Sequence, residues 1–352
     1  MSSKQEKIMS FDPNGVGLKN GHFIGLPFEE ADAEVVLLSV PWDVTVSSGE
    51  GTATGPANIL EASSQLDLFD PNIVNAWKMG LFMRPSDPYW ISKNEELRPL
   101  AKKYIENLEE GLDPAASPQM TRMRDEINQA CEKLREWVYL ETRQMMDAGK
   151  LVGLVGGEHS VPLGFLQALA ERYPNFGILQ IDAHMDLREA YEGLTYSHAS
   201  IFFNALRLPQ VSRLVQVGIR DYCEEEWRLA KQSGVRVQVF TEQNIGELKF
   251  QGNAFSEVCQ SVVRSLPEHV YISFDIDGLD PSLCPNTGTP VPGGLQYGEA
   301  MFLINMLQQS GKTIIGFDLC ETGGLGNDWD GNVGARILYK LANAMGHSNG
   351  KI

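Results

Sequence analysis

Three side chains that can bind a metal ion end the stretch Ile178-Leu179-Gln180-Ile181-Asp182-Ala183-His184-Met185-Asp186. The stretch begins as an uncharged run of β-forming residues, which is typical of a strand buried on both faces of a parallel sheet. Alternate side chains of an extended chain share one face, so Asp182, His184 and Asp186 can converge where this strand stops. Two carboxylates and an imidazole meeting there would form a site for a divalent cation.

Two further predicted strands end in residues of the same kind. One ends in Gly156-Gly157-Glu158-His159, where the two glycines let the chain turn so that His159 faces back over the sheet. The other ends in Asp275-Ile276-Asp277, again with two acids separated by one residue. The four aspartates of this set would carry four negative charges, which two divalent cations would neutralise. A binuclear site is therefore expected, and its imidazole and carboxylate ligands suit Mn, Ni, Co or Fe better than a structural zinc. The six candidate ligands are His159, Asp182, His184, Asp186, Asp275 and Asp277.

The elements that would position these ligands form an α/β pattern. Strands alternate mostly with helical segments after residue 150, and two more strands precede them, which predicts a mainly parallel sheet of eight strands with helices on both faces. Ligand sites in such sheets lie beyond the carboxyl ends of the strands. The predicted strands are Val35–Val40, Lys78–Met83, Leu151–Val155, Gly177–Ile181, Arg213–Val217, Val235–Phe240, Val270–Phe274 and Thr313–Phe317.

The chain outside this alternation has two parts. Residues 1–33 mix Gly, Pro and charge without a clear period and predict an irregular N-terminal arm. Residues 34–352 are expected to form a single domain. Within it, a segment at about 84–150 carries two charged helical patterns, the second with apolar residues spaced by three and four from about Ser117 to Ala148. We interpret this segment as a helical insertion that covers the sheet.

Composition limits the partners and the compartment. The 352 residues include 29 basic and 46 acidic side chains, and the net charge of -17 would repel nucleic acid and attract cations, although an acidic surface can also serve solubility alone. The N-terminus is polar and no run of about 18 apolar residues occurs, so no membrane span is expected. Five cysteines without a C-x-x-C pair favour a reducing compartment. The prediction is a cytoplasmic protein.

At these motifs the sequence resembles the ureohydrolase family, which includes arginase, agmatinase, guanidinobutyrase, formimidoylglutamase and guanidine hydrolase. The resemblance implies an arginase-like three-layer α/β/α domain, a binuclear site that is usually Mn, and a homo-oligomer that is a trimer or a hexamer. Ni accepts the same ligands, so the metal is expected to be Mn²⁺ or Ni²⁺. The matching pieces are Pro41-Trp42-Asp43, Gly156-Gly157-Glu158-His159-Ser160, Asp182-Ala183-His184-Met185-Asp186, Ser273-Phe274-Asp275-Ile276-Asp277-Gly278-Leu279-Asp280-Pro281 and Gly316-Phe317-Asp318-Leu319-Cys320-Glu321.

The resemblance also implies a role for each matching residue. Asp182 and Asp275 would bridge the two metals, and a hydroxide between the metals would be the nucleophile, oriented by Asp186. Glu321 would hold the NH groups of a cationic guanidinium substrate, and His198 would donate or shuttle a proton to the leaving amine. The first metal would be bound by His159, Asp182, Asp186 and Asp275, and the second by Asp182, His184, Asp275 and Asp277.

Departures from the family pattern bear on the substrate. Residues 187–198 lack the set with which arginases bind the α-amino acid head, so arginine is disfavoured. Trp329 follows Glu321 where the family usually has a proline-containing stretch; it would wall a short pocket or serve as ordinary packing. The expected function is release of urea from a small guanidino compound, guanidine or agmatine. The alternatives are guanidinobutyrase or formimidoylglutamase-type activity, a non-catalytic partner subunit on the same fold, and a mononuclear zinc deacetylase.

Overall fold

The computed structural model describes residues 3–352 and contains one sheet of eight strands. All neighbouring strands are parallel, in the order β2-β1-β3-β8-β7-β4-β5-β6. Each predicted strand is present, and β1 and β4 are buried at every residue, as expected where helices cover both faces. The strands are β1 (Val35–Val40), β2 (Leu81–Met83), β3 (Leu151–Gly156), β4 (Phe176–Ile181), β5 (Val211–Ile219), β6 (Val237–Thr241), β7 (His269–Asp275) and β8 (Thr313–Cys320).

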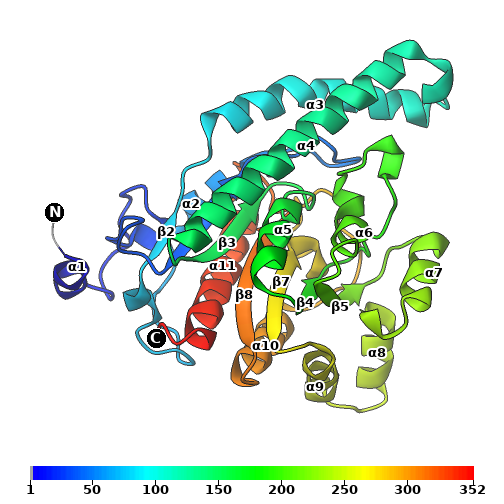
Figure 1. Ribbon diagram of the computed structural model, residues 1–352. Coiled ribbons are helices and arrows are strands. Elements are labelled where there is room, and N and C mark those ends of the chain that lie inside the picture. The colour runs from blue at the N-terminus through cyan, green and yellow to red at the C-terminus, as the bar shows by residue number, and fades with distance from the viewer. Residues whose placement is uncertain (1–2) are drawn as a thin grey trace.

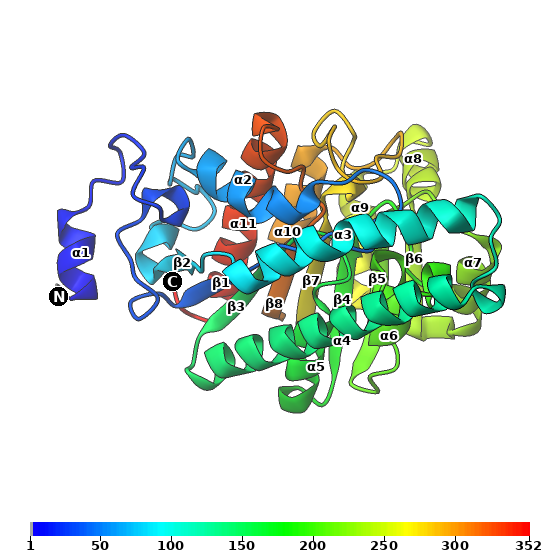
Figure 2. The same ribbon diagram turned by 90° about the horizontal axis from the view of Figure 1, so that it is seen from above.

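Helices form a layer on each face of the sheet (Figure 1, Figure 2). The apolar side chains of the sheet divide between two clusters, one for each layer. The first layer holds α2 (Gly55–Ser63), α8 (Glu242–Phe250), α9 (Phe255–Ser265), α10 (Tyr297–Gln309) and α11 (Asp328–Ser348). The second holds α3 (Pro88–Glu109), α4 (Pro118–Asp147), α5 (Leu163–Arg172), α6 (Ile201–Ala205) and α7 (Glu224–Gln232). The predicted three-layer α/β/α architecture is confirmed.

The helices α3 and α4 occupy most of the segment predicted as an insertion, and they lie side by side in both views. Each begins at a proline that follows a capping side chain: the Asp87 carboxylate accepts from the Tyr89 N–H, and the Ser117 hydroxyl accepts from the Met120 N–H. The apolar stripe of α4 is buried against α5 and the sheet, as its spacing predicts. Whether the segment is an insertion into a single domain remains a prediction.

The N-terminal residues differ from the expected irregular arm. Lys4–Ser10 form the helix α1, which starts with a reciprocal cap between Ser3 and Glu6. The helix is tied down by an ion pair of 2.6 Å between Lys7 and Asp32. Farther along, Phe23, Leu26 and Phe28 are fully buried in the core of the first layer. The prediction of irregular structure is therefore wrong for α1, whose seven residues are too few to show a helical period in the sequence.

The middle of the sheet determines where the site lies. Strands β3, β8, β7 and β4 are consecutive neighbours, although they come from distant parts of the chain. Because all run in the same direction, their carboxyl ends meet at one edge, where ligand sites of open parallel sheets form. No helix among residues 3–352 has the length and apolar character needed to cross a membrane.

Candidate metal and substrate site

The turn after β3 brings His159 over the carboxyl edge of the sheet. It contains Gly157, where an added Cβ would lie 2.1 Å from the Trp42 carbonyl oxygen, so only glycine fits this close approach. The imidazole is buried, and its Nδ1 lies 3.0 Å from an Asp182 oxygen, 3.1 Å from an Asp186 oxygen and 3.2 Å from an Asp275 oxygen. Carboxylates from the ends of β4 and β7 thus surround a ring nitrogen that follows the end of β3.

A second group forms around His184. Its Nδ1 lies 3.1 Å from an Asp277 oxygen and 3.6 Å from an Asp182 oxygen. Backbone amides fix these carboxylates, because the Ala183 N–H donates to Asp277 and the His184 N–H donates to Asp182. Asp182 therefore belongs to both groups, and each group offers three ligand atoms close enough to share one ion.

The ionisation of these groups fits the presence of cations. The Nδ1 of His159 has three carboxylates around it but makes no hydrogen bond within the described chain. Burial raises the pKa of Asp275 well above its usual range, and the charges of Asp277 and Asp182 raise it further. Burial and the Asp182 charge raise the pKa of Asp186 to about 7. So many buried carboxylates repel one another unless positive ions lie between them.

Side chains behind the candidate ligands orient them. The Nε2 of His159 lies 2.9 Å from the Ser273 hydroxyl, which donates to Asp318 at 2.7 Å. This arrangement leaves Nδ1 free to face the carboxylates. On β4, Gln180 donates to Asp182 at 2.8 Å. The supporting roles of Gln180, Ser273 and Asp318 were not predicted from the sequence. Each of these residues nevertheless lies within a matching piece, or two residues from a matching acid on the same face of a strand.

Glu321 follows β8 and has an unusual environment. Its φ of 61° is left-handed, and its Oε1 accepts from the His159 N–H at 2.9 Å. The other oxygen, Oε2, is buried and has no hydrogen-bond partner among residues 3–352. Burial and the charge of Glu158 raise the pKa of Glu321 well above its usual range. A buried carboxylate oxygen without a donor is costly, so this atom is suited to a donor that arrives with a ligand.

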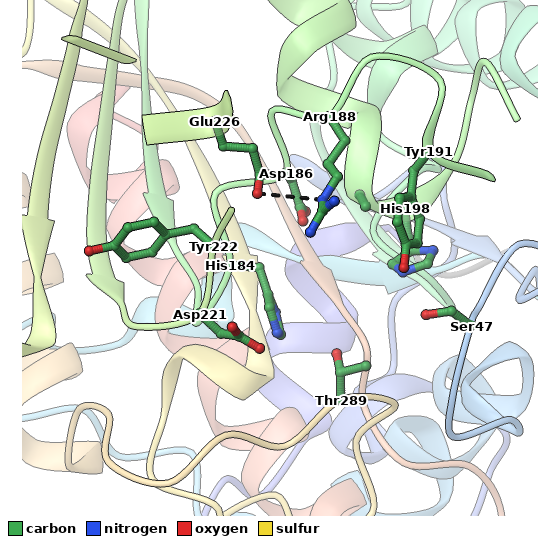
Figure 3. Close-up of a pocket in the computed structure, with 11 residues that line it drawn as sticks. Ser47, His184, Asp186, Arg188, Tyr191, His198, Asp221, Tyr222, Glu226 and Thr289 are labelled. Carbon is green, nitrogen blue, oxygen red and sulfur yellow. Dashed lines mark ion pairs between the residues drawn. The ribbon is translucent and has the colours of Figure 1, made fainter. Parts of the chain in front are cut away.

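A cleft of about 170 Å³ borders two of the candidate ligands, His184 and Asp186 (Figure 3). It is lined by His184 and Asp186 from the β4 end and by His198, whose Nδ1 lies 3.5 Å from the Thr45 hydroxyl. Burial and the charge of His184 lower the pKa of His198 to about 4. Glu321 is buried and is not among the residues that line this cleft.

Three charged residues that were not predicted as site residues, Arg188, Asp221 and Glu226, also line the cleft. Arg188 lies over the Tyr191 ring and pairs with the buried Glu226, with a distance of 3.5 Å between Nε and Oε2. Asp221 points its carboxylate toward the same space as the His184 ring (Figure 3). It forms no ion pair with any residue of the described chain. Nothing in the sequence near these residues distinguishes them from ordinary surface charges.

Trp329 lies apart from this lining. It is 52% exposed at the start of α11, and its indole N–H donates to the Ser282 carbonyl at 2.9 Å. Within residues 3–352 it is not among the side chains that line the cleft. Its part in substrate binding therefore stays a prediction, and these contacts give it no support.

Comparison with known proteins yields consistent matches. Residues 33–341 match the family model described as the arginase family. The chain is 33% identical over 321 residues to N(1)-aminopropylagmatine ureohydrolase of Thermus thermophilus, a match that covers 91% of this chain and 92% of that protein. It is 31% identical over 298 residues to the agmatinase of Bacillus anthracis, covering 84% of each.

Solved structures show the same fold. Proclavaminate amidino hydrolase from Streptomyces clavuligerus superposes with a TM-score of 0.72 at 20% identity, covering 95% of this chain and 100% of that chain. The agmatine ureohydrolase of Thermoplasma volcanium superposes with a TM-score of 0.69 at 22% identity, covering 98% and 99%.

Proposed function

The chain belongs to the arginase family and is a hydrolase of amidine C–N bonds, and we propose that it releases urea from a small guanidino compound with a cationic tail, such as agmatine. The observation that carries the proposal is a pair of side-chain clusters, one around His159 and one around His184, that share Asp182. Each cluster consists of imidazole and carboxylate groups. Relatives named agmatinase and N(1)-aminopropylagmatine ureohydrolase support the choice of substrate class.

The proposed metals are two divalent cations, Mn²⁺ or Ni²⁺, because the ligand set contains only imidazole and carboxylate groups. His159, Asp182, Asp186 and Asp275 would hold the first cation, and Asp182, His184, Asp275 and Asp277 the second. When bound, the cations supply the positive charge that ionises a water molecule near neutral pH. All six candidate ligands are present, and their side chains gather at the carboxyl edge of the sheet. A non-catalytic partner subunit would be expected to lack one or more of them, so this alternative is disfavoured.

Glu321 is proposed to bind the guanidinium group. Its unpaired Oε2 would accept an N–H of the planar cation, and this charge-assisted contact would aim the central carbon at the metal-binding edge. Desolvation disfavours the carboxylate in the free protein, and the cationic substrate would restore its charged form. The net reaction converts the guanidinium and one water into urea and a protonated amine.

His198 is proposed as the proton shuttle to the leaving amine. It borders the same cleft as Asp186, and its lowered pKa keeps the imidazole neutral at pH 7, with one nitrogen able to accept a proton. Its Nδ1 faces the hydroxyls of Thr45 and Ser197 at 3.5 and 3.4 Å. These contacts restrict the ring to an orientation in which only one nitrogen is free for transfer.

Asp221 is proposed to bind the far end of the substrate. Its unpaired carboxylate in the cleft suits an ammonium group, whereas the charge of Arg188 is already balanced by Glu226. A carboxylate tail would be repelled by Asp221, which disfavours the guanidinobutyrase alternative, and guanidine itself would leave Asp221 without a partner. Agmatine offers one cation to each carboxylate, its guanidinium group to Glu321 and its ammonium group to Asp221.

The oligomer and the compartment are also proposals. We expect a trimer or a hexamer on the basis of family resemblance, and light scattering after gel filtration would measure the mass. The five cysteines are all free, which supports a reducing compartment such as the cytoplasm.

Urea release tests the proposed function directly. The protein is loaded separately with Mn²⁺ and Ni²⁺, its metal content is measured, and it is assayed with agmatine, N(1)-aminopropylagmatine, guanidine, 4-guanidinobutyrate and arginine. Two metals per chain and the highest kcat/KM with a cationic-tail substrate are expected. Asp277→Ala should lose one metal and nearly all turnover, whereas Asp280→Ala, three residues away, should keep both. A loaded protein that releases urea from none of these compounds would refute the function.

A further inference from the structure

The helix pair α3 and α4 contacts two loops that border the cleft. The first loop is residues 43–51 and carries Ser47, and the second loop is residues 187–197 and carries Arg188 and Tyr191. We infer that the helix pair is a clamp that holds both loops in the arrangement needed for turnover, with Arg98, Tyr104 and Asn128 as positioning residues. The inference rests on the proposed function, because both loops border the same site.

The first loop is held by one stripe of α3. Asn94, Arg98 and Lys102 are spaced by four residues and therefore share a face of the helix. The Arg98 guanidinium is 13% exposed and donates to the carbonyls of Val44 and Val46 at 3.0 and 2.8 Å. Asn94 exchanges two hydrogen bonds with Asp43, and Lys102 lies 3.3 Å from Glu50. These contacts join the loop to α3 at both of its ends and in its middle.

The second loop is backbone-strained and is held from α3 and α4. Ala190 and Glu192 have left-handed φ angles of 48° and 57°, which side chains other than glycine adopt only under constraint from their surroundings. The buried Tyr104 donates its hydroxyl to the Glu192 carbonyl at 2.8 Å. Asn128 donates to the Gly193 carbonyl at 3.0 Å and accepts from the Thr195 N–H at 2.8 Å. Three hydrogen bonds from the helix pair therefore fall within four consecutive loop residues.

The two loops meet at the proposed proton shuttle. The hydroxyl of Thr45, in the first loop, accepts from the N–H of His198, which directly follows the second loop, at 3.1 Å. The same hydroxyl donates to Glu158, the neighbour of the candidate ligand His159. A shift of either loop would therefore move His198 relative to the candidate ligands at the strand ends.

Tyr104→Phe tests the contact to the second loop. It keeps the buried ring and removes the hydroxyl that holds Glu192. Tyr139→Phe is the matched control, because it removes a hydroxyl on α4 that donates to Glu171, away from both loops. We expect about fivefold faster amide hydrogen exchange in residues 190–197 and about fivefold lower kcat in Tyr104→Phe, with KM within twofold and two metals per chain. The control should match the wild type in all four measurements.

Arg98→Lys tests the contact to the first loop, because a lysine cannot donate to both carbonyls in the same fork geometry. Faster exchange confined to residues 43–51 is expected, with Arg143→Lys on the exposed side of α4 as control. Exchange no faster than in the controls, exchange faster throughout the chain, or an unchanged kcat in Tyr104→Phe would each overturn the clamp. If the wild type releases no urea from any compound, the proposed function fails, and the exchange comparison alone decides whether the helices hold the loops.

Discussion

Replacing Asp221 with asparagine removes a negative charge from the cleft and leaves the size of the side chain almost unchanged. The carboxylate forms no ion pair within residues 3–352, so the change breaks no existing salt bridge. Two unit charges 4 Å apart attract by about 4 kcal/mol at an effective dielectric constant of 20, before the cost of desolvation. Hydrogen bonds to charged groups contribute about 1.5–3 kcal/mol net. Because Asp221 is exposed, we take the lower value, which corresponds to about a tenfold loss of kcat/KM for agmatine.

A pair of substrates isolates this contact. Agmatine and butylguanidine share the guanidinium and a four-carbon chain, and only agmatine carries the terminal ammonium group. Urea release should show the tenfold loss for agmatine alone, and the loss should shrink as salt is raised, because the Debye length is about 10 Å at 0.1 M. Hydrolysis of 4-guanidinobutyrate should improve, since a repulsion is removed. An equal loss with both guanidines would refute the reasoning and would place Asp221 in support of the neighbouring His184 backbone instead.

Three further changes give distinct readouts. Glu321→Gln retains an acceptor for the His159 N–H but replaces the unpaired oxygen with a donor; kcat/KM should fall at least about a hundredfold at unchanged metal content, and a smaller loss would contradict the guanidinium contact. Ser273→Ala removes the hydrogen-bond partner of His159 Nε2 and should weaken metal binding about 10- to 100-fold in a chelator competition, whereas unaltered affinity would show that the hydroxyl does not orient the ring. Burial and the charge of Glu109 raise the pKa of Glu192 from 4.5 to about 7. Between these pH values the folded state binds more protons than the unfolded state. The free energy of unfolding therefore falls as the pH rises through this window. Glu192→Gln should therefore raise the melting temperature at pH 8 by about 2 °C, corresponding to about 1 kcal/mol after allowance for solvent screening, and should have little effect at pH 4; an equal gain at both pH values would exclude the carboxylate charge as the cause.

The sequence predicted the sheet because its strands carry uncharged apolar runs of ordinary strand length. It also predicted which residues would meet, because a period of two and a shared strand direction place Asp182, His184 and Asp277 at one edge. The loop charges Arg188 and Asp221 were beyond such reasoning. Their position depends on how the loops fold back over the carboxyl edge of the sheet, and loop conformation has no periodic signal in the sequence.

The contacts of α3 were hidden for a related reason. Asn94, Arg98 and Lys102 form a polar stripe with the same spacing as any solvent-facing helix surface. The spacing does not show whether this face contacts water or the backbone of a loop, because both offer hydrogen-bond partners to the same polar side chains. Trp329 shows the opposite case, because an aromatic residue near a site motif suggested a pocket wall, while the fold exposes half of its surface and ties its indole to Ser282.

The left-handed backbone at Asp186 and Glu321 has a consequence for engineering. A residue with a side chain costs about 1–2 kcal/mol in this conformation, and glycine would relieve much of that strain. A library screened for heat tolerance alone would therefore enrich glycine at these two codons and discard the carboxylates that they encode. A selection for thermostable variants should therefore keep Asp186 and Glu321 unchanged. Alternatively, it should make growth of the cells depend on the nitrogen that the enzyme releases from its substrate.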